Sequence, residues 1–165
     1  MPETPQQLLT RFYEAFARKD AEAMAACYHA DSAFSDPVFM MLNHDETCAM
    51  WRMLVGRAQD FSLTFEVKGD DRVEWIARYT FAKTGRSVVN RVKSQFGFQD
   101  GLILAQRDGF DFYPWMRQAL GLKGALRGWT RLMQGVVRKE ARKSLEPFMA
   151  KHRWRFITTW KGAGG

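Results

Sequence analysis

The chain has 165 residues, of which 46% are hydrophobic and 14% aromatic, and its formal net charge is +7. This composition predicts one folded domain with a sizeable core and excludes a mostly disordered chain, and no apolar run reaches the length of a membrane span. The charge is uneven: residues 1–113 hold 13 basic and 16 acidic residues, a net of −3, whereas residues 114–165 hold 12 and 2, a net of +10.

The change in charge divides the chain into two predicted parts. Residues 1–113 are expected to form a pocket domain, and residues 114–165 a basic helical extension that packs on it. The start of the chain lacks a signal-peptide core, which predicts a cytoplasmic protein. Cys27 and Cys48 are isolated, so buried thiols are favoured over a disulfide or a zinc site. No metal is predicted, because His29 and Asp31 make no metal-ligand set on their own and no HExxH motif is present. No cofactor is predicted, because the chain carries neither a Walker loop nor a Rossmann glycine pattern.

The N-terminal segment predicts two helices. Thr4 can cap the first helix, along which Phe12 and Phe16 recur at helical spacing. Asp20 can cap a second, short helix that carries Tyr28. The other aromatic residues are expected to be core, but the Tyr28 hydroxyl needs a hydrogen-bond partner when it is buried.

A short strand from Ser32 to Asp36 is expected next, and Pro37 ends its hydrogen bonding to a neighbour. Asp36 is a candidate site carboxylate, and an ordinary turn residue before proline is the alternative. Asn43 can cap the following helix, whose buried side includes Trp51.

The centre of the chain alternates apolar and polar residues in a way that predicts an antiparallel meander. Its strands are expected at Phe61 to Lys68, Trp75 to Phe81, Val88 to Phe98 and Leu102 to Asp111. The inward faces of the last three strands are expected to carry Trp75, Ala77, Tyr79 and Phe81, then Asn90, Val92, Ser94, Phe96 and Phe98, and finally Leu102, Leu104, Gln106, Asp108 and Phe110.

Asp108 is the unusual residue in this pattern. A carboxylate on an apolar face is costly unless it is paired, hydrogen-bonded or in a wet cavity, so the pattern predicts a pocket with Asp108 in its wall. Two carboxylates in one half-dry pocket cannot both ionise freely. If Asp36 faces the same pocket, the pKa of one of them is raised toward neutrality.

The extension predicts further helices. Trp115 to Leu120 indicates a helical turn that Gly121 breaks, and Trp129 to Lys151 a basic amphipathic helix that Pro147 ends or kinks. The segment from Trp154 to Trp160 is expected to be strand-like or irregular. The apolar stripe of the basic helix is formed by Leu132, Val136 and Val137.

Three roles fit the basic extension. It can fold back over the sheet or the rim of the pocket, with Trp115 buried near the last strand, and this packing is favoured. A membrane surface is the second reading, with Trp129, Trp154 and Trp160 at the lipid interface. Nucleic acid is the third and is not predicted, since the chain shows no recognised nucleic-acid module.

The order of elements resembles the nuclear transport factor 2-like (NTF2-like) superfamily over residues 4–113. The stretches that resemble uncharacterised SnoaL-like bacterial proteins are Ser35-Asp36-Pro37-Val38-Phe39, Met50-Trp51-Arg52-Met53-Leu54, Arg107-Asp108-Gly109-Phe110-Asp111 and Trp115-Met116-Arg117-Gln118-Ala119-Leu120-Gly121. The resemblance implies an α+β cone, in which a curved antiparallel sheet wraps around the N-terminal helices and encloses a pocket. It also implies a homodimer, joined through the outer face of the sheet that carries Arg78, Arg91 and Lys93.

Two enzyme branches of this superfamily resemble different parts of the chain. In ketosteroid isomerases the general base is an aspartate followed by proline, which Asp36 matches, while their tyrosine and acid positions hold Phe12 and Ser94. In limonene epoxide hydrolases a last-strand aspartate activates water, which Asp108 matches, while the arginine of their partner pair is replaced by Trp75.

The sequence therefore predicts a small-molecule enzyme with Asp36 and Asp108 as its catalytic acid and base. An isomerase, cyclase, dehydratase or hydrolase reaction on a small apolar or carbonyl-containing molecule is expected. The alternative is a binding module that holds an apolar ligand without chemistry. The residues expected to contact the ligand are Phe12, Tyr28, Trp51, Trp75, Tyr79, Asn90, Ser94, Gln106 and Phe110.

Overall fold

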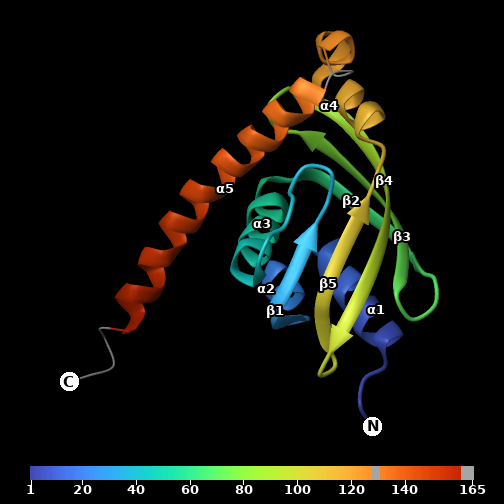
Figure 1. Cartoon of the computed structure of the whole chain (residues 1–165), viewed down its shortest axis with the longest axis vertical. Helices are drawn as coiled ribbons and strands as arrows, with labels where there is room; N and C mark the ends of the chain where they lie inside the picture. Colours follow the sequence, from blue (N-terminus) through green and yellow to red (C-terminus); the bar gives the residue numbers. More distant parts are fainter. Residues whose placement is uncertain (128–130, 161–165) are drawn as a thin grey trace.

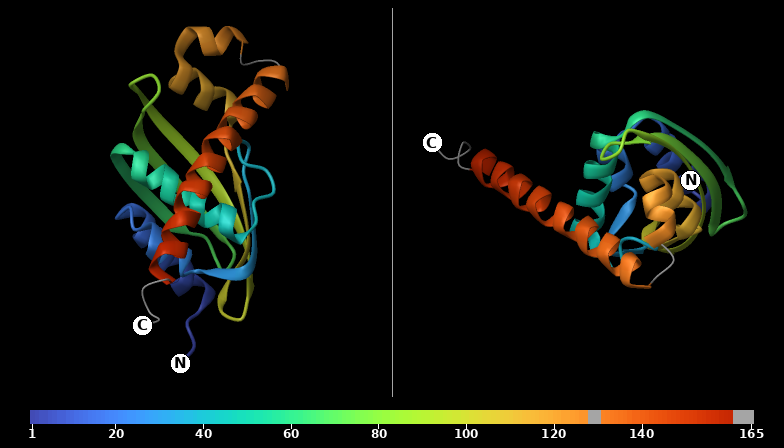
Figure 2. Two further views of the ribbon diagram at one scale, coloured as in Figure 1. Left: turned by 90° about the vertical axis from the view of Figure 1, so that its left-hand side faces the viewer. Right: turned by 90° about the horizontal axis from the view of Figure 1, so that it is seen from above.

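The computed structural model describes residues 1–127 and 131–160. Five strands form one open, curved sheet in the order β1-β5-β4-β3-β2, and α1 lies inside its curve (Figures 1 and 2). The strands are β1 (Tyr28–Ser35), β2 (Gln59–Val67), β3 (Arg72–Phe81), β4 (Arg86–Gln99) and β5 (Leu102–Gly109). The predicted α+β class and the four-strand meander are confirmed. One detail differs from the expected antiparallel sheet, because β1 pairs with β5 in parallel.

The helices of the cone begin where the sequence places their caps. Thr4 and Gln7 form a capping box at the start of α1 (Pro5–Ala17), and Asn43 and Glu46 form one at the start of α3 (His44–Arg57). Asp20 caps the short α2 (Ala21–Ala25). The placement of Tyr28 in this second helix was wrong, because the backbone turns after α2 and Tyr28 is the first residue of β1.

A bulge near the β4–β5 turn changes which side chains face inward. The pairing shifts between Gly97 and Phe98, so Phe98 is paired with Ile103, and Ile103 is fully buried. Leu104 is only half-buried, and its expected place on the inner face is therefore wrong. Beyond the bulge the alternation holds, and Gln106 and Asp108 are both buried.

The extension consists of α4 (Phe112–Arg127) and α5 (Arg131–Trp160). Gly121 interrupts α4 with a φ of 72°, as the glycine suggested. One expectation for α5 was wrong, because the segment expected to be strand-like or irregular continues the helix to Trp160, so one long helix replaces two elements. Pro147 lies inside this helix and does not end it.

The extension contacts the cone at two places. Helix α4 packs on β4 at the end of the cone away from the N-terminus, which is called the wide end below (Figure 1). Helix α5 runs along α3 and projects beyond it (Figures 1 and 2). Leu145 of α5 enters the core, at 1% exposure, and Ala141, Phe148 and Met149 pack against the core, whereas Val136 of the predicted stripe is 46% exposed. The side chains of Leu132, Trp154 and Trp160, and all of Trp129, lie outside the described residues.

The predicted division of the chain at residue 113 stays a prediction. The β5 strand ends at Gly109 and α4 begins at Phe112, but no observation tests a boundary at residue 113. No helix in the described part of the chain has the length and apolarity that crossing a membrane requires.

Candidate functional site

The sheet brings Asp36 and Asp108 close to each other. In the parallel β1–β5 pair, Phe34 is opposite Gln106 and Ser35 is opposite Arg107. Asp36 is the first residue after β1, and it is close enough to Asp108 for its charge to raise the pKa of that carboxyl. Gln106 and Asp108 are buried on the inner face of β5, whereas Asp36, beyond the end of β1, is half-buried.

Hydrogen bonds converge on one oxygen of Asp108. The Ser94 hydroxyl donates to Asp108 Oδ1 at 2.6 Å, and Gln106 Nε2 donates to the same atom at 2.9 Å. Ser94 Oγ in turn accepts from the Tyr13 hydroxyl at 3.0 Å and from Trp75 Nε1 at 2.8 Å. The side chains in this first arm are all buried, so the carboxylate is held by a network of buried groups.

A second arm reaches Asp108 through Gln106. The Tyr28 hydroxyl donates to Gln106 Oε1 and accepts from Trp51 Nε1, which is 2.9 Å away. Each group donates to the next, from the Trp51 indole to the Asp108 carboxylate. The partner expected for the Tyr28 hydroxyl is thus identified, and the direction of the bonds fixes Gln106 with its amide nitrogen toward Asp108.

The network sets the chemistry of Asp108. Burial raises the pKa of Asp108 to about 7, although the hydrogen bonds from Ser94 and Gln106 act to lower it, and the charge of Asp36 raises it further. Since both donors bind Oδ1, the proton of the neutral acid resides on Oδ2. No fully buried side-chain nitrogen or oxygen in the described residues lacks a partner, and no described residue bonds Oδ2, so this atom keeps a small accessible surface within the 5% exposure of Asp108.

Asp36 is held by its own loop. Its Oδ1 accepts hydrogen bonds from the backbone N–H groups of Val38, at 2.7 Å, and Phe39, at 2.5 Å. The turn role considered as an alternative is therefore real, and it leaves Oδ2 free of partners among the described residues. Burial raises the pKa of Asp36 to about 6, against these two hydrogen bonds and the positive charge of Arg138, which lower it.

The wide end of the cone has an aromatic wall. Trp115 of α4 is half-buried rather than buried as expected, and its Nε1 donates to the Tyr79 hydroxyl at 2.8 Å. Its ring is 6.3 Å from that of Phe110 and 5.8 Å from that of Phe81. Asn90, paired with Ala77, is half-buried on the same face of the sheet.

One expected ligand contact, Phe12, is part of the packed core. Phe12 is fully buried, with its ring edge-on to Tyr28 at 5.5 Å and to Trp51 at 6.0 Å. Tyr13, the neighbour of Phe12, was missed as a polar residue of the site. Helical spacing places Tyr13 on the same buried side as Phe12, and only the pairing of its hydroxyl with Ser94 distinguishes the two.

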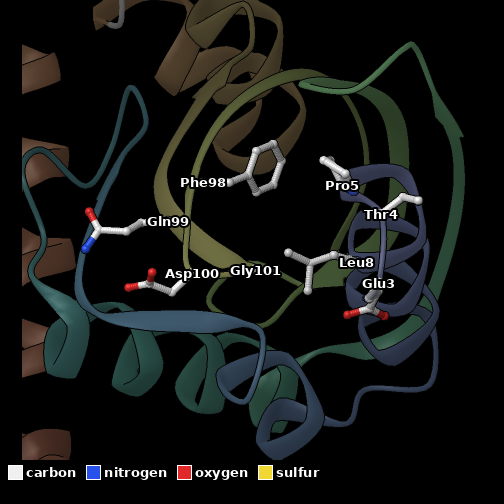
Figure 3. Close-up of a pocket in the computed structure, with 8 residues that line it drawn as sticks. All are labelled: Glu3, Thr4, Pro5, Leu8, Phe98, Gln99, Asp100 and Gly101. Atoms are coloured by element: carbon white, nitrogen blue, oxygen red, sulfur yellow. The ribbon is translucent and has the colours of Figure 1, made fainter. Parts of the chain in front are cut away.

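The surface cavities described in the structure lie elsewhere. One of about 190 Å³ is at the narrow end of the cone, where Pro5 and Leu8 of α1 face Phe98 of β4 (Figure 3). Another of about 420 Å³ lies over β2, β3 and β4, and its lining includes Trp75 and Arg91. Neither contains Asp36 or Asp108, so a conical pocket around the carboxylates stays a prediction.

The described residues give no donor set for a metal. Within residues 1–127 and 131–160, no three His, Cys, Asp or Glu side chains are grouped in a way that could hold an ion. Cys27 and Cys48 are buried free thiols, and burial raises the pKa of both.

The family model described as SnoaL-like domain matches residues 9–106. The chain belongs to this SnoaL-like family. The matched part includes Asp36, Ser94 and Gln106 and stops two residues before Asp108. Helices α4 and α5 lie outside it. A comparison with the curated proteins finds no match.

Solved structures share the NTF2-like fold of this SnoaL-like chain. An epoxide hydrolase of the limonene-hydrolase type from Mycobacterium tuberculosis is 24% identical, with a TM-score of 0.56, 80% of this chain covered and 98% of that one. A candidate polyketide cyclase from Silicibacter is 20% identical, with a TM-score of 0.59 and coverage of 71% and 96%. A hypothetical protein with a ketosteroid isomerase-like fold from Catenulispora acidiphila, in complex with trimethylamine, is 13% identical, with a TM-score of 0.59 and coverage of 77% and 98%. At these identities the likeness establishes the fold alone.

Proposed function

We propose that this SnoaL-like protein is an acid–base enzyme that moves a proton on a small carbonyl compound. The observation that carries the proposal is the pair formed by Asp36 and Asp108, whose pKa values are raised to about 6 and about 7. Groups that titrate near neutrality are suited to general acid and base catalysis at that pH. The fold shared with cyclases, isomerase-like proteins and an epoxide hydrolase is consistent with such a reaction.

The two carboxylates take different roles near pH 7. Asp36 has the lower pKa and is mostly ionised there, so its free Oδ2 is the base that removes a proton from the carbon next to the carbonyl. The electron pair of that C–H bond moves toward the carbonyl oxygen and forms an enolate. Asp108 is about half protonated and can give a proton from Oδ2 to the substrate, which completes the isomerisation. The proton taken by Asp36 then passes to solvent and Asp108 takes one back, which restores both carboxyls for the next turnover.

Exchange of substrate hydrogen for solvent deuterium tests the proposal without knowledge of the natural substrate. A set of cyclic ketones and enones is incubated with the full chain in D₂O, and deuterium at the carbon next to the carbonyl is measured by mass spectrometry. We expect exchange that Asp36→Asn lowers at least 100-fold, since general-base catalysis contributes about 10² to 10⁴ in rate. The exposed Asp70→Asn is the control. Exchange that is equal in the wild type and Asp36→Asn contradicts the proposal.

Binding without chemistry is the second candidate. It is favoured by the use of Asp36 Oδ1 to hold a turn, which engages that oxygen with two backbone N–H groups. A crystal soaked with apolar fragments separates the two functions. Fragments that bind away from both carboxylates, together with an absence of deuterium exchange, favour the binding module.

A second copy of the chain is the proposed partner. The outer face of the sheet presents Glu66 and Glu74 beside Arg91 and Lys93, around the cavity of about 420 Å³. Acidic and basic side chains on one face can pair with the same face of a second molecule related by a two-fold axis. Light scattering at micromolar concentration and moderate salt is expected to give the mass of a dimer, and a monomer mass rejects this partner. Cytoplasmic location likewise stays a prediction.

A further inference from the structure

The hydroxyl of Tyr79 is a donor without an acceptor. Its oxygen accepts a hydrogen bond from Trp115 Nε1 at 2.8 Å, and no described residue accepts the hydroxyl proton. Tyr79 is on the same face of β3 as the buried Trp75 and Ala77, so its side chain is directed toward the interior of the cone. The phenol therefore has one bond from the protein and one proton to give.

The surroundings of Tyr79 suit a planar, neutral molecule. Phe81 and Phe110 contact Trp115 at ring distances of 5.8 and 6.3 Å, and they form a half-buried aromatic wall beside the phenol. Asp36 is close enough for its charge to raise the pKa of Tyr79, after burial and against the bond from Trp115. A base and a hydrogen-bond donor thus face the same wide end of the cone.

We infer that Tyr79 is the hydrogen-bond donor to the carbonyl oxygen of the substrate, and that Trp115 of the extension is the positioning residue that holds Tyr79 for this role. The inference rests on the proposed acid–base function and narrows its substrate class to ketones and enones that lie against the aromatic wall. It assigns a part of the site to α4, which is outside the matched residues 9–106.

The chemistry requires such a donor. When Asp36 takes the proton from carbon, negative charge develops on the carbonyl oxygen, and a fixed donor in a water-poor site stabilises that charge. The position of Phe12 offers none, because its side chain has no polar atom and is fully buried. The indole N–H of Trp115 can only donate, so it leaves the hydroxyl proton of Tyr79 available for the substrate. Its N–H occupies one lone pair of the Tyr79 oxygen, which restrains the hydroxyl and favours its use as a donor.

A stable anion tests the donor without turnover. The yellow 4-nitrophenolate ion has a planar ring and a charged oxygen that mimics an enolate, and its visible absorbance reports the ionised fraction of bound nitrophenol. We expect the full chain to bind 4-nitrophenol and to increase its ionised fraction. Tyr79→Phe should weaken phenolate binding by roughly 10-fold to 100-fold, the loss expected for a hydrogen bond to a charged group. The matched control is Tyr113→Phe, which removes a phenol hydroxyl from the exposed face of α4.

Trp115→Phe tests the positioning role. This variant keeps an aromatic ring and removes the N–H, so phenolate binding should weaken by roughly threefold to tenfold, in the same direction as in Tyr79→Phe. If Tyr79→Phe does not fold, 3-fluorotyrosine at position 79 keeps the hydroxyl and strengthens it as a donor, and phenolate binding should tighten. Phenolate binding that is unchanged in Trp115→Phe would show that Trp115 does not position Tyr79 and that α4 has no part in the site.

The outcomes separate this inference from the proposed function. Loss of deuterium exchange in Asp36→Asn, with full exchange and full phenolate binding in Tyr79→Phe, overturns the role of Tyr79 and leaves acid–base catalysis standing. Phenolate binding that depends on Tyr79, without deuterium exchange by the wild type, supports the donor and contradicts catalysis. Failure of the wild-type chain to bind 4-nitrophenol overturns the inference directly.

Discussion

The inside of the cone and its wide end hold their polar groups in different ways. Around Asp108, all the partners come from α1, α3 and the sheet, and the bonds form one directed network of buried side chains. At the wide end, Tyr79 is held by Trp115 of α4, and the carbonyl of Pro37, next to Asp36, accepts from Arg138 Nε of α5 at 2.9 Å. The interior is thus built from the shared fold, whereas the wide end depends on the extension.

This difference assigns the two regions different roles. The interior fixes a carboxyl group whose pKa is raised by burial, with Ser94 and Gln106 as its hydrogen-bond donors. The extension supplies groups at the wide end, where Trp115 bonds Tyr79 and Arg138 bonds Pro37. Variants in the two regions should therefore act on different carboxyls: interior changes alter the titration of Asp108, and changes at the contacts of the extension with the wide end alter the titration of Asp36 and ligand binding.

The largest expected effect is on the pH dependence of stability. The pKa of Asp108 is about 7 in the folded chain, against 3.8 for an ordinary aspartate, so the folded state binds this proton more tightly. Its contribution is fully present below pH 3.8 and is lost as the pH rises through 7. We expect Asp108→Asn to remove roughly 4 kcal/mol of pH-dependent change in unfolding free energy over this range.

Urea unfolding at several pH values measures that change as the difference between the wild type and Asp108→Asn. Asp70→Asn, in an exposed turn, serves as the control and should follow the wild-type curve. Parallel curves for the wild type and Asp108→Asn would show that the folded chain does not hold this proton.

Ser94 joins both donors of the first arm to Asp108. Ser94→Ala leaves the Tyr13 hydroxyl and the Trp75 indole without an acceptor, so it should destabilise the chain by about 3 kcal/mol. It also removes a donor from Asp108, which should raise the pKa of that carboxyl further. Ser87→Ala, exposed on the same strand, is the control and should change stability by less than about 0.5 kcal/mol. Equal stabilities of the two variants contradict the network.

Leu145 tests whether the extension belongs to the fold. It is 1% exposed, and Leu145→Ala should cost about 2 kcal/mol of stability through lost burial and a cavity. Val136→Ala, at a site 46% exposed on the same helix, should cost much less. Thermal unfolding of the two variants gives the comparison. If Leu145→Ala is as stable as Val136→Ala, α5 does not pack on α3 in solution, and the membrane-surface reading of the extension gains support.

Arg138 gives the smallest expected effect. Arg138→Gln keeps an N–H donor for the Pro37 carbonyl but removes the charge that lowers the pKa of Asp36, so this pKa should rise above about 6. The change in stability should be about 0.5 kcal/mol or less, because the side chain is half-exposed. NMR titration of Asp36 in both proteins measures the shift in pKa. An unchanged titration midpoint would show that the charge of Arg138 in α5 does not act on Asp36.

Much of the site could be predicted because strands alternate. Period-2 spacing placed Ser94, Gln106 and Asp108 on one face, and a carboxylate on that face required partners. The same reasoning failed at Ile103 and Leu104, since a bulge exchanges faces by one residue and leaves no clear mark in the sequence.

Long-range pairing was harder to predict. Tyr13 has the spacing of an ordinary core residue, and its bond to Ser94 joins residues 81 positions apart. Helix propensity on both sides of Pro147 outweighed the expected break, so α5 became one helix. The contacts of Trp115 and Arg138 could not be derived either, because they depend on how the extension returns to the cone.

The carboxyl carbons of Asp36 and Asp108 provide the most direct test of the central claim that the cone holds an acid and a base that titrate near neutrality. Carbon-13 NMR of the full chain from pH 3 to pH 9, with Asp36→Asn and Asp108→Asn for assignment, measures both midpoints. We predict midpoints of about 6 for Asp36 and about 7 for Asp108. Two midpoints close to the ordinary value of 3.8 would contradict the account.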